Sequence, residues 1–324
     1  MNNPKRNHHV TPKLYLKGFV IKKDDPSIWV YKRDNQYNPG DDQTINNPYK
    51  DSIKNAGVER DFYANPKADG TQDFETFENK LELLEKPADP IFQKIRARQV
   101  ITEEEKCLFS CYIIQMYRRV LSGREKVKKL LATQTYEPSK EFFEKTNLPD
   151  TPEMRAELKI ISDNMKQKPG FDIQAHNRIT AATPDSFMIE ALQKMIWTFY
   201  IPPAPHAFLT SDNPVFISEH FGLGKNISEL SFPISSDVAL VASWNKFVKE
   251  GFSEVPPQFL KELNRRTISG ASQNVYFSKS PEWVLKILNK NVYKYRPMYS
   301  VKSVHDVVKL VTDGADSKPR LIWS

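Results

Sequence analysis

Six polar side chains in this sequence could together form a reactive or binding site: His9, Glu59, Arg60, Arg118, Asp212 and Asn213. Imidazole exchanges protons near neutral pH and is a common metal ligand. A carboxylate can orient an imidazole or hold a divalent cation, while amide and guanidinium groups can contact an anion. These residue types predict acid–base chemistry, with or without a divalent metal, if the fold brings them together.

His9 is the second of two adjacent histidines, and the side chains of neighbouring residues usually point apart. At most one of them is therefore expected in a site. Pro12 stiffens the following turn, and Leu14, Leu16 and Phe19 are expected to anchor this irregular segment to a core. The alternative is that the histidine is buried and only makes a structural hydrogen bond.

Asp212 and Asn213 follow an apolar run, Ala207-Phe208-Leu209, and precede Pro214. Because the residue before proline favours extended geometry, the pair is expected at the end of a strand, where binding residues often lie. The alternative is turn chemistry, in which Asp and Asn hydrogen-bond nearby backbone.

The three other candidate residues, Glu59, Arg60 and Arg118, lie in two charged segments. Glu59-Arg60-Asp61 stands beside Phe62-Tyr63, and its alternative interpretation is a surface ion-pair cluster. Arg118-Arg119 ends an apolar helix, where both side chains could face water and interact favourably with the helix dipole. Otherwise one arginine faces inward and pairs with an acid such as Glu59, Asp61 or Asp212.

Local patterns predict the elements that must position these residues. Ser27 to Tyr31 is β-branched and aromatic, as in a strand. Apolar residues from Phe74 to Leu84 predict a helix that Pro87 and Pro90 break. Thr102 and Glu105 form a capping box, which starts a buried helix that is expected to end near Leu131.

The second half of the chain has a mixed pattern. Helices are expected from Thr151-Pro152, from Thr183-Pro184 to Tyr200, and over 258–271 and 281–288. Strands are expected over 207–210, 215–218, 238–243 and 275–278. Since βαβ alternation is absent, the sequence predicts an α+β fold with a predominantly helical central block and a mixed, partly antiparallel sheet formed by N- and C-terminal strands. We expect a single extended domain over 1–324.

Composition narrows the class of protein. The chain has 324 residues, a formal charge of +7 and only two cysteines, Cys107 and Cys111, which are expected to be core thiols. No signal peptide, apolar spanning run, phosphate-binding loop or zinc-protease motif is present, so we expect a cytoplasmic protein without a membrane partner. Its oligomeric state does not follow from these patterns.

The quoted segments also resemble a known family. His9-Val10-Thr11-Pro12 to Phe19, Glu59 to Tyr63, Arg118, Ser211-Asp212-Asn213-Pro214-Val215 and Phe232-Pro233-Ile234-Ser235 occur in the order seen in a bacterial family catalogued as domain of unknown function 4238. The resemblance covers residues 8–280 as one domain and leaves a C-terminal helix and tail over 281–324. It implies no reaction, but it favours a site made of His9, Asp212 and Asn213.

Two functions from different classes follow. The first is a hydrolase of phosphodiesters or nucleic acid, in which His9 is the general acid or base, Asp212 orients it or holds a divalent metal, and Asn213 and Arg118 contact the developing anion. Arg60 and Glu59 would bind substrate. The second is a non-catalytic binding or sensor protein of a bacterial stress or phage-response locus. In that case the same residues form a structural network. The small basic excess would suit a nucleic acid or nucleotide partner of the hydrolase, and the alternative is a well-solvated, slightly basic surface.

Overall fold

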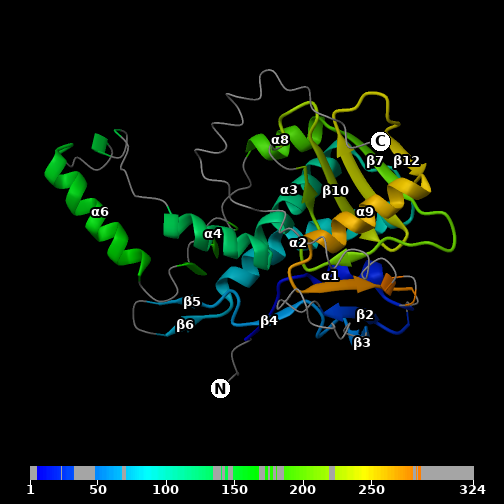
Figure 1. Ribbon diagram of the computed structural model, residues 1–324, viewed down its shortest axis with the longest axis horizontal. Helices are drawn as coiled ribbons and strands as arrows, with labels where there is room; N and C mark the ends of the chain where they lie inside the picture. The colour runs from blue at the N-terminus through cyan, green and yellow to red at the C-terminus, as the bar shows by residue number, and fades with distance from the viewer. Residues whose placement is uncertain are drawn as a thin grey trace, which may run out of the picture.

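The computed structural model shows how the chain is arranged (Figure 1). The structure describes residues 6–22, 24–32, 48–67, 71–133, 140, 143–144, 149–167, 172–173, 176–177, 180, 186–218, 223–279, 282 and 284–285. The predicted C-terminal helix and tail over 281–324 lie almost entirely outside these residues, and so does the predicted helix start at Thr183-Pro184.

The larger sheet has the strand order β12-β7-β11-β10-β9. Its strands are β7 (Ile196–Ile201), β9 (Phe216–Ile217), β10 (Glu229–Ser235), β11 (Val238–Ser243) and β12 (Gly251–Glu254). All pairs are antiparallel except β12 with β7, which is parallel. Every residue of β11 is buried, as expected for a central strand covered on both faces.

The second sheet joins the two ends of the described chain. Its order is β3-β2-β13-β8, with β2 (Ser27–Lys32), β3 (Tyr49–Ser52), β8 (Thr210–Ser211) and β13 (Asn274–Phe277), all antiparallel. Two short ribbons complete the strands, β1 (Asn7–His9) with β4 (Val58–Arg60) and β5 (Asn65–Pro66) with β6 (Gln72–Asp73). N- and C-terminal strands thus share a sheet, which confirms the predicted α+β class.

The longer helices are α2 (Thr76–Arg96), α3 (Glu103–Arg119), α4 (Leu121–Thr133), α6 (Pro152–Lys166), α8 (Ser186–Lys194) and α9 (Pro257–Gly270). The predicted capping box opens α3: the Thr102 hydroxyl accepts from the Glu105 amide, and the Glu105 carboxylate accepts from the Thr102 amide. In Figure 1, α6 projects away from the two sheets, whereas α2 and α3 lie against them.

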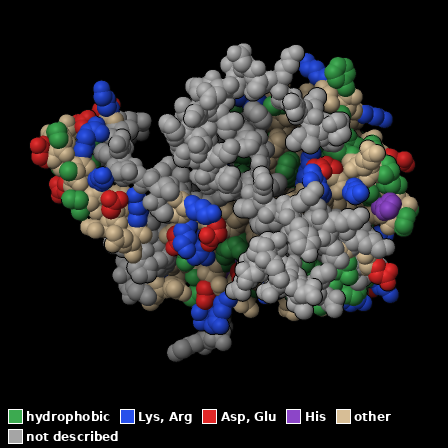
Figure 2. Space-filling model, in the orientation of Figure 1, with side chains coloured by type: hydrophobic (Ala, Val, Ile, Leu, Met, Phe, Trp, Pro, Cys, Tyr) green, Lys and Arg blue, Asp and Glu red, His purple; other side chains and the backbone are tan. Residues whose placement is uncertain are grey.

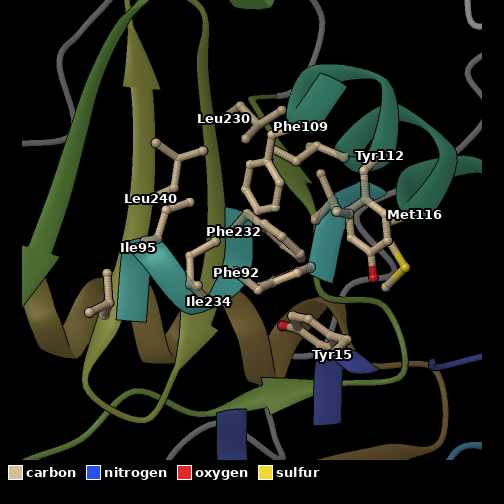
Figure 3. Packing of buried hydrophobic residues seen from close by; sticks show 14 of the residues in the cluster. Tyr15, Phe92, Ile95, Phe109, Tyr112, Met116, Leu230, Phe232, Ile234 and Leu240 are labelled. Carbon is tan, nitrogen blue, oxygen red and sulfur yellow. The ribbon is translucent and has the colours of Figure 1, made fainter. Parts of the chain in front are cut away.

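Aromatic side chains fill the main core between α2, α3 and the larger sheet (Figure 3). The Phe92 and Phe109 rings meet edge to face with centroids 4.9 Å apart, and Tyr15 stacks on Phe232 at 5.1 Å. Tyr15 comes from the N-terminal segment, so that segment is part of the core of the molecule.

Three predicted elements were wrong. Pro87 and Pro90 lie inside the continuous helix α2, because Ala88, Ile91 and Phe92 between and beyond them are buried, and that burial outweighs the lost backbone bonds. The helix expected to run to Leu131 ends at Arg119 instead, since Val120 is extended (ψ 162°).

The third error concerns residues 196–200, which were expected to be helical. They belong to strand β7, whose sequence Ile-Trp-Thr-Phe-Tyr-Ile is β-branched and aromatic. The strand β10 was missed because Pro233 lies within it. The pairing of β10 with β11 shifts register between Pro233 and Ser235, and such an irregularity accommodates a residue without an N–H donor.

Candidate functional site

The N-terminal segment enters the fold through the ribbon of β1 and β4, where His9 lies opposite Val58 and His8 opposite Glu59. The amides of Val10 and Thr11 then both donate to the carbonyl of Gly57, at 2.9 and 3.1 Å. Gly57 has φ +70°, and a Cβ there would lie 2.7 Å from the Thr11 side chain. Glycine therefore allows the close approach that fixes Thr11. Helix α1 (Lys13–Leu16) and the 3-10 turn η1 (Lys17–Phe19) follow.

The two histidines have different environments. His8 is fully buried: its Nδ1 accepts from the Tyr63 amide at 3.0 Å, and its Nε2 lies 3.1 Å from the Phe74 carbonyl. These partners fit a neutral ring that donates through Nε2, so His8 has a structural role. His9 is half-buried, and its backbone carbonyl accepts from Arg119 Nη2 at 2.7 Å. The predicted acid–base role of His9 stays a prediction.

Of the two arginines that end α3, Arg119 faces inward. Its side chain is buried and donates to the Glu85 carboxylate at 2.5 Å and to the Tyr63 hydroxyl at 3.3 Å. The expectation of an inward-facing arginine paired with a carboxylate is confirmed, but the partner is Glu85 and not Glu59, Asp61 or Asp212. Because it also binds the His9 carbonyl, Arg119 ties the end of α3 to β1.

Arg118 is half-buried, and its backbone carbonyl lies 3.0 Å from His176 Nε2. This contact fixes the main chain at the end of α3 and leaves the role of the guanidinium open. The contact of Arg118 with a substrate therefore stays a prediction.

Asp212 anchors the connection between α9 and β13. Its Oδ1 accepts from the Ser272 amide at 2.7 Å, and its Oδ2 accepts from the amides of Gln273 and Asn274 at 2.6 and 2.9 Å. The Asp212 amide in turn donates to the Asn274 carbonyl at 3.1 Å. An ionised carboxylate has about four lone-pair positions, so three backbone donors use most of its capacity.

Asn213 belongs to the same anchor. Its side-chain amide donates to the Gly270 carbonyl, the last residue of α9, at 2.9 Å, and its backbone amide donates to Ser211 Oγ at 3.2 Å. The residues just before β8 are held similarly, because Asn264 on α9 bonds both Ala207 and Leu209. The strand predicted over 207–210 is therefore shorter, and β8 begins only at Thr210.

Tyr276, in β13, is buried, and several polar side chains shift its pKa. Burial raises its pKa well above the usual value, the Asp212 carboxylate adds to that shift, and the Thr11 side chain opposes it. Tyr49 and Glu59 raise it further. The groups that shift the pKa of Tyr276 come from the N-terminal segment, from β3 and β4, and from the residue after β8.

A hydrogen bond between Tyr15 and Thr210 shows that the N-terminal segment lies against β8. The Tyr15 hydroxyl lies 2.5 Å from Thr210 Oγ1 and donates to the Pro233 carbonyl at 2.8 Å. Thr210 is two residues before Asp212. The fold therefore brings the His9–Phe19 segment and the acid–amide pair to the same region of the smaller sheet.

Glu59 and Arg60 are neighbours on β4, so their side chains point to opposite sides of the strand. Glu59 is half-buried, and its pKa is raised by burial, an effect that Lys32 opposes. Arg60 is exposed and lies 3.7 Å from Asp61, whose carboxylate is held by Arg6 at 2.9 and 2.5 Å. Glu59 therefore lies partly inside the fold, whereas Arg60 belongs to a surface ion-pair group.

The described residues form no group of metal ligands. Among the residues that the structure describes, no three His, Cys, Asp or Glu side chains are grouped as metal ligands. Cys107 and Cys111 are free and half-buried rather than enclosed in the core. On the face shown in Figure 2, Lys and Arg side chains lie interspersed with Asp and Glu over the described surface.

Sequence reasoning missed the buried positions of Thr11 and Tyr276, and it named Arg119 only as one of two arginines that could face inward. Neither Thr11 nor Tyr276 is of a residue type that signals such a position locally. Only the pairing of β13 between β2 and β8 places Tyr276 at the centre.

Comparison with known proteins identifies a family. The model of a family described as "Protein of unknown function (DUF4238)" matches residues 7–281. Neither a curated protein nor a solved structure matches the chain. No described helix is long and apolar enough to cross a membrane.

Proposed function

The chain belongs to the DUF4238 family, and from this premise we propose that it binds a ligand without converting it. One observation carries the proposal: the Asp212 carboxylate accepts three backbone amides from residues 272–274. A residue used in this way holds a loop in place, and the loop leads into the strand that carries Tyr276.

The surrounding contacts support the same conclusion. Asn213 holds the end of α9, His8 is fully used by backbone partners, and Arg119 binds the His9 carbonyl. Asn213 fixes the end of α9, whereas His8 and Arg119 fix β1 against the Tyr63 amide and the end of α3. Because such buried networks specify one arrangement, they suit a protein whose surface must be presented in a fixed form.

The expected ligand is anionic, a nucleotide or a nucleic acid, because the chain has a formal charge of +7. A bacterial, cytoplasmic sensor of stress or phage infection is the kind of protein that would use such binding. Phosphate contacts by Lys and Arg would make the affinity fall steeply with salt.

The test compares stability with activity in one substitution. Asp212→Asn keeps the side-chain size but removes the charge that three amides bind, so we expect the free energy of unfolding to fall by about 2 kcal/mol and the melting temperature by roughly 2–4 °C. Calorimetry and fluorescence melting measure this change. Asp237→Asn is the matched control, since Asp237 is an exposed acid in a turn.

The same proteins would be incubated with nucleotides and with single- and double-stranded DNA and RNA, and both binding and products would be measured. We expect bound but unchanged ligand. Product formation by the wild type that Asp212→Asn abolishes, at an unchanged melting temperature, would disprove the binding proposal.

A second candidate is the hydrolase of phosphodiesters or nucleic acid. Glu59 favours it, because a half-buried carboxyl with a raised pKa is typical of a general acid or base. His9 would share the proton transfer, while Asn213, Arg118 and Arg60 would bind the anion. In that case Glu59→Gln should abolish product formation with little effect on binding.

A further inference from the structure

Three connections lie together at one end of the strands of the larger sheet. β7 starts at Ile196, which pairs with Ser243 at the end of β11, and Ser243 pairs with Glu229 at the start of β10. The segment from α8 into β7, the β9–β10 loop and the β11–β12 loop therefore emerge together. Figure 1 shows α8 and the connection into β12 at the same end of the molecule.

Large apolar side chains are exposed on these connections. Phe247 in the β11–β12 loop is 99% exposed, Phe187 on α8 is 62% exposed, and Ile227 in the β9–β10 loop is 54% exposed. Single exposed apolar residues are ordinary, but three on adjacent connections form a patch that needs an explanation.

Specific contacts hold the connections next to one another. The indole Nε1 of Trp244 donates to the Leu223 carbonyl at 2.8 Å, which joins the β11–β12 loop to the β9–β10 loop. A Cβ at Gly224 would lie 2.6 Å from the Phe187 ring, so the ring lies directly over that glycine. The segments that carry the three apolar side chains therefore lie next to one another.

Phe247 lies in a hydrogen-bonded turn that begins at Asn245. The Asn245 side chain accepts from the Phe247 amide at 3.0 Å, and the Asn245 carbonyl accepts from the Val248 amide at 3.3 Å. On the far side, the Thr198 hydroxyl donates to the Lys249 carbonyl at 2.8 Å. These bonds form an Asx turn that fixes the backbone from which Phe247 projects into solvent.

Lysines are exposed on the loops that carry Ile227 and Phe247. Lys225, Lys246 and Lys249 are exposed on the same loops, and no ion pair joins them to a carboxylate among the described residues. The acids nearby have other partners, Glu190 with Lys194 at 3.9 Å and Glu250 with Lys106 at 3.3 Å. We call these six residues the loop-edge surface: Phe187, Lys225, Ile227, Lys246, Phe247 and Lys249.

We propose that the loop-edge surface binds the headgroup region of an anionic lipid bilayer. Aromatic and aliphatic side chains inserted at the acyl boundary, with lysines at headgroup level, are the recognised chemistry of interfacial binding. The aliphatic Ile227 favours lipid over single-stranded nucleic acid, because stacking on bases needs aromatic rings. Such contact needs no spanning helix, so the lack of one among the described helices does not oppose it.

The test is sedimentation of the full chain with vesicles of phosphatidylcholine alone or with about one-third phosphatidylserine. We expect binding only to the anionic vesicles, and we expect it to weaken as salt is raised. Phe247→Ser should lower the partition coefficient about tenfold, and Lys246→Gln with Lys249→Gln should lower it about fivefold for each lysine. Because these side chains are exposed, the melting temperatures should not change.

Leu83→Ser is the matched control, since Leu83 on α2 is 71% exposed but outside the loop-edge surface. It should bind vesicles like the wild type. Equal binding of wild type and Phe247→Ser, or no binding of wild type to anionic vesicles, would overturn the proposal. So would binding of a single-stranded oligonucleotide that Phe247→Ser weakens while vesicles stay unbound. The vesicle results leave the proposed function and the Asp212→Asn test untouched, whereas oligonucleotide binding that Phe247→Ser weakens would overturn the lipid proposal and support the proposed nucleic-acid ligand.

Discussion

At the residue scale, most polar side chains of the candidate site hydrogen-bond to backbone groups, and Glu59 is an exception. Asp212, Asn213 and His8 bind mainly backbone groups, and this use is structural. Glu59 differs, since burial raises its pKa and Lys32 only partly opposes the effect. Its ionised form is thus less favourable in the folded chain than in the unfolded one.

The pH dependence of stability tests this environment. A raised folded pKa gives a stability contribution that is fully present below the unfolded value of about 4.3 and is lost as pH rises through the folded pKa. Glu59→Gln removes the charge, so at pH 7 we expect the variant to melt above the wild type. The difference should vanish near pH 4.

Melting curves from about pH 4 to pH 8 measure this difference. Glu254→Gln on β12 is the matched control, because it removes an exposed carboxylate from a strand. A constant difference between Glu59→Gln and wild type over that range would contradict the prediction.

At the element scale, helix α2 shows burial overriding local preference. It continues through Pro87 and Pro90, although proline inside a helix costs about 3 kcal/mol. Both prolines are exposed, while the side chains that face α3 and the sheet are buried. The helix is therefore held by its packed face and not by its full set of backbone bonds.

Pro90→Ala should stabilise the protein. Alanine restores a backbone donor and removes the steric conflict, which outweighs the roughly 1 kcal/mol lost when the unfolded chain becomes less stiff. We expect the free energy of unfolding to rise by about 2 kcal/mol, measured by denaturant titration.

Lys86→Ala is the control for this measurement, since Lys86 is an exposed non-proline residue of the same helix. A loss of stability in Pro90→Ala would mean that the prolines shape α2 for its packing against α3.

At the scale of the whole molecule, the N-terminal segment acts as a link between elements far apart in sequence. Tyr15 reaches Thr210 and Pro233, and Arg96 donates to the carbonyls of Leu14, Tyr15 and Ile234. Gly18 is needed at this junction, because a Cβ there would lie 2.6 Å from the Ile234 carbonyl oxygen.

Tyr15→Phe tests this link. It leaves Thr210 Oγ1 and the Pro233 carbonyl without their buried partner, so we expect a loss of about 1–3 kcal/mol. Hydrogen exchange should accelerate over residues 6–19 before the core strands are affected. Tyr200→Phe, half-buried on β7, is the control. Uniform exchange over the whole chain would show that the segment does not open separately.

The sequence by itself determined what depends on neighbouring residues. The capping box at Thr102, the strand around Trp29, the helix that starts at Pro152 and the α+β class follow from caps, alternation and periodicity. The resemblance to the family was also visible in the order of its segments. Each of these signals needs only short-range physics, because caps and side-chain periods are local.

Only the tertiary structure decided which polar groups meet. Arg119 rather than Arg118 faces inward because of how α3 packs, and Tyr276 becomes central because β13 lies between β2 and β8. The continuation of α2 through two prolines and the strand β7 at residues 196–201 were set by burial against distant elements. Local propensities differ by a few kcal/mol at most, and the burial of large side chains from far along the chain outweighs them.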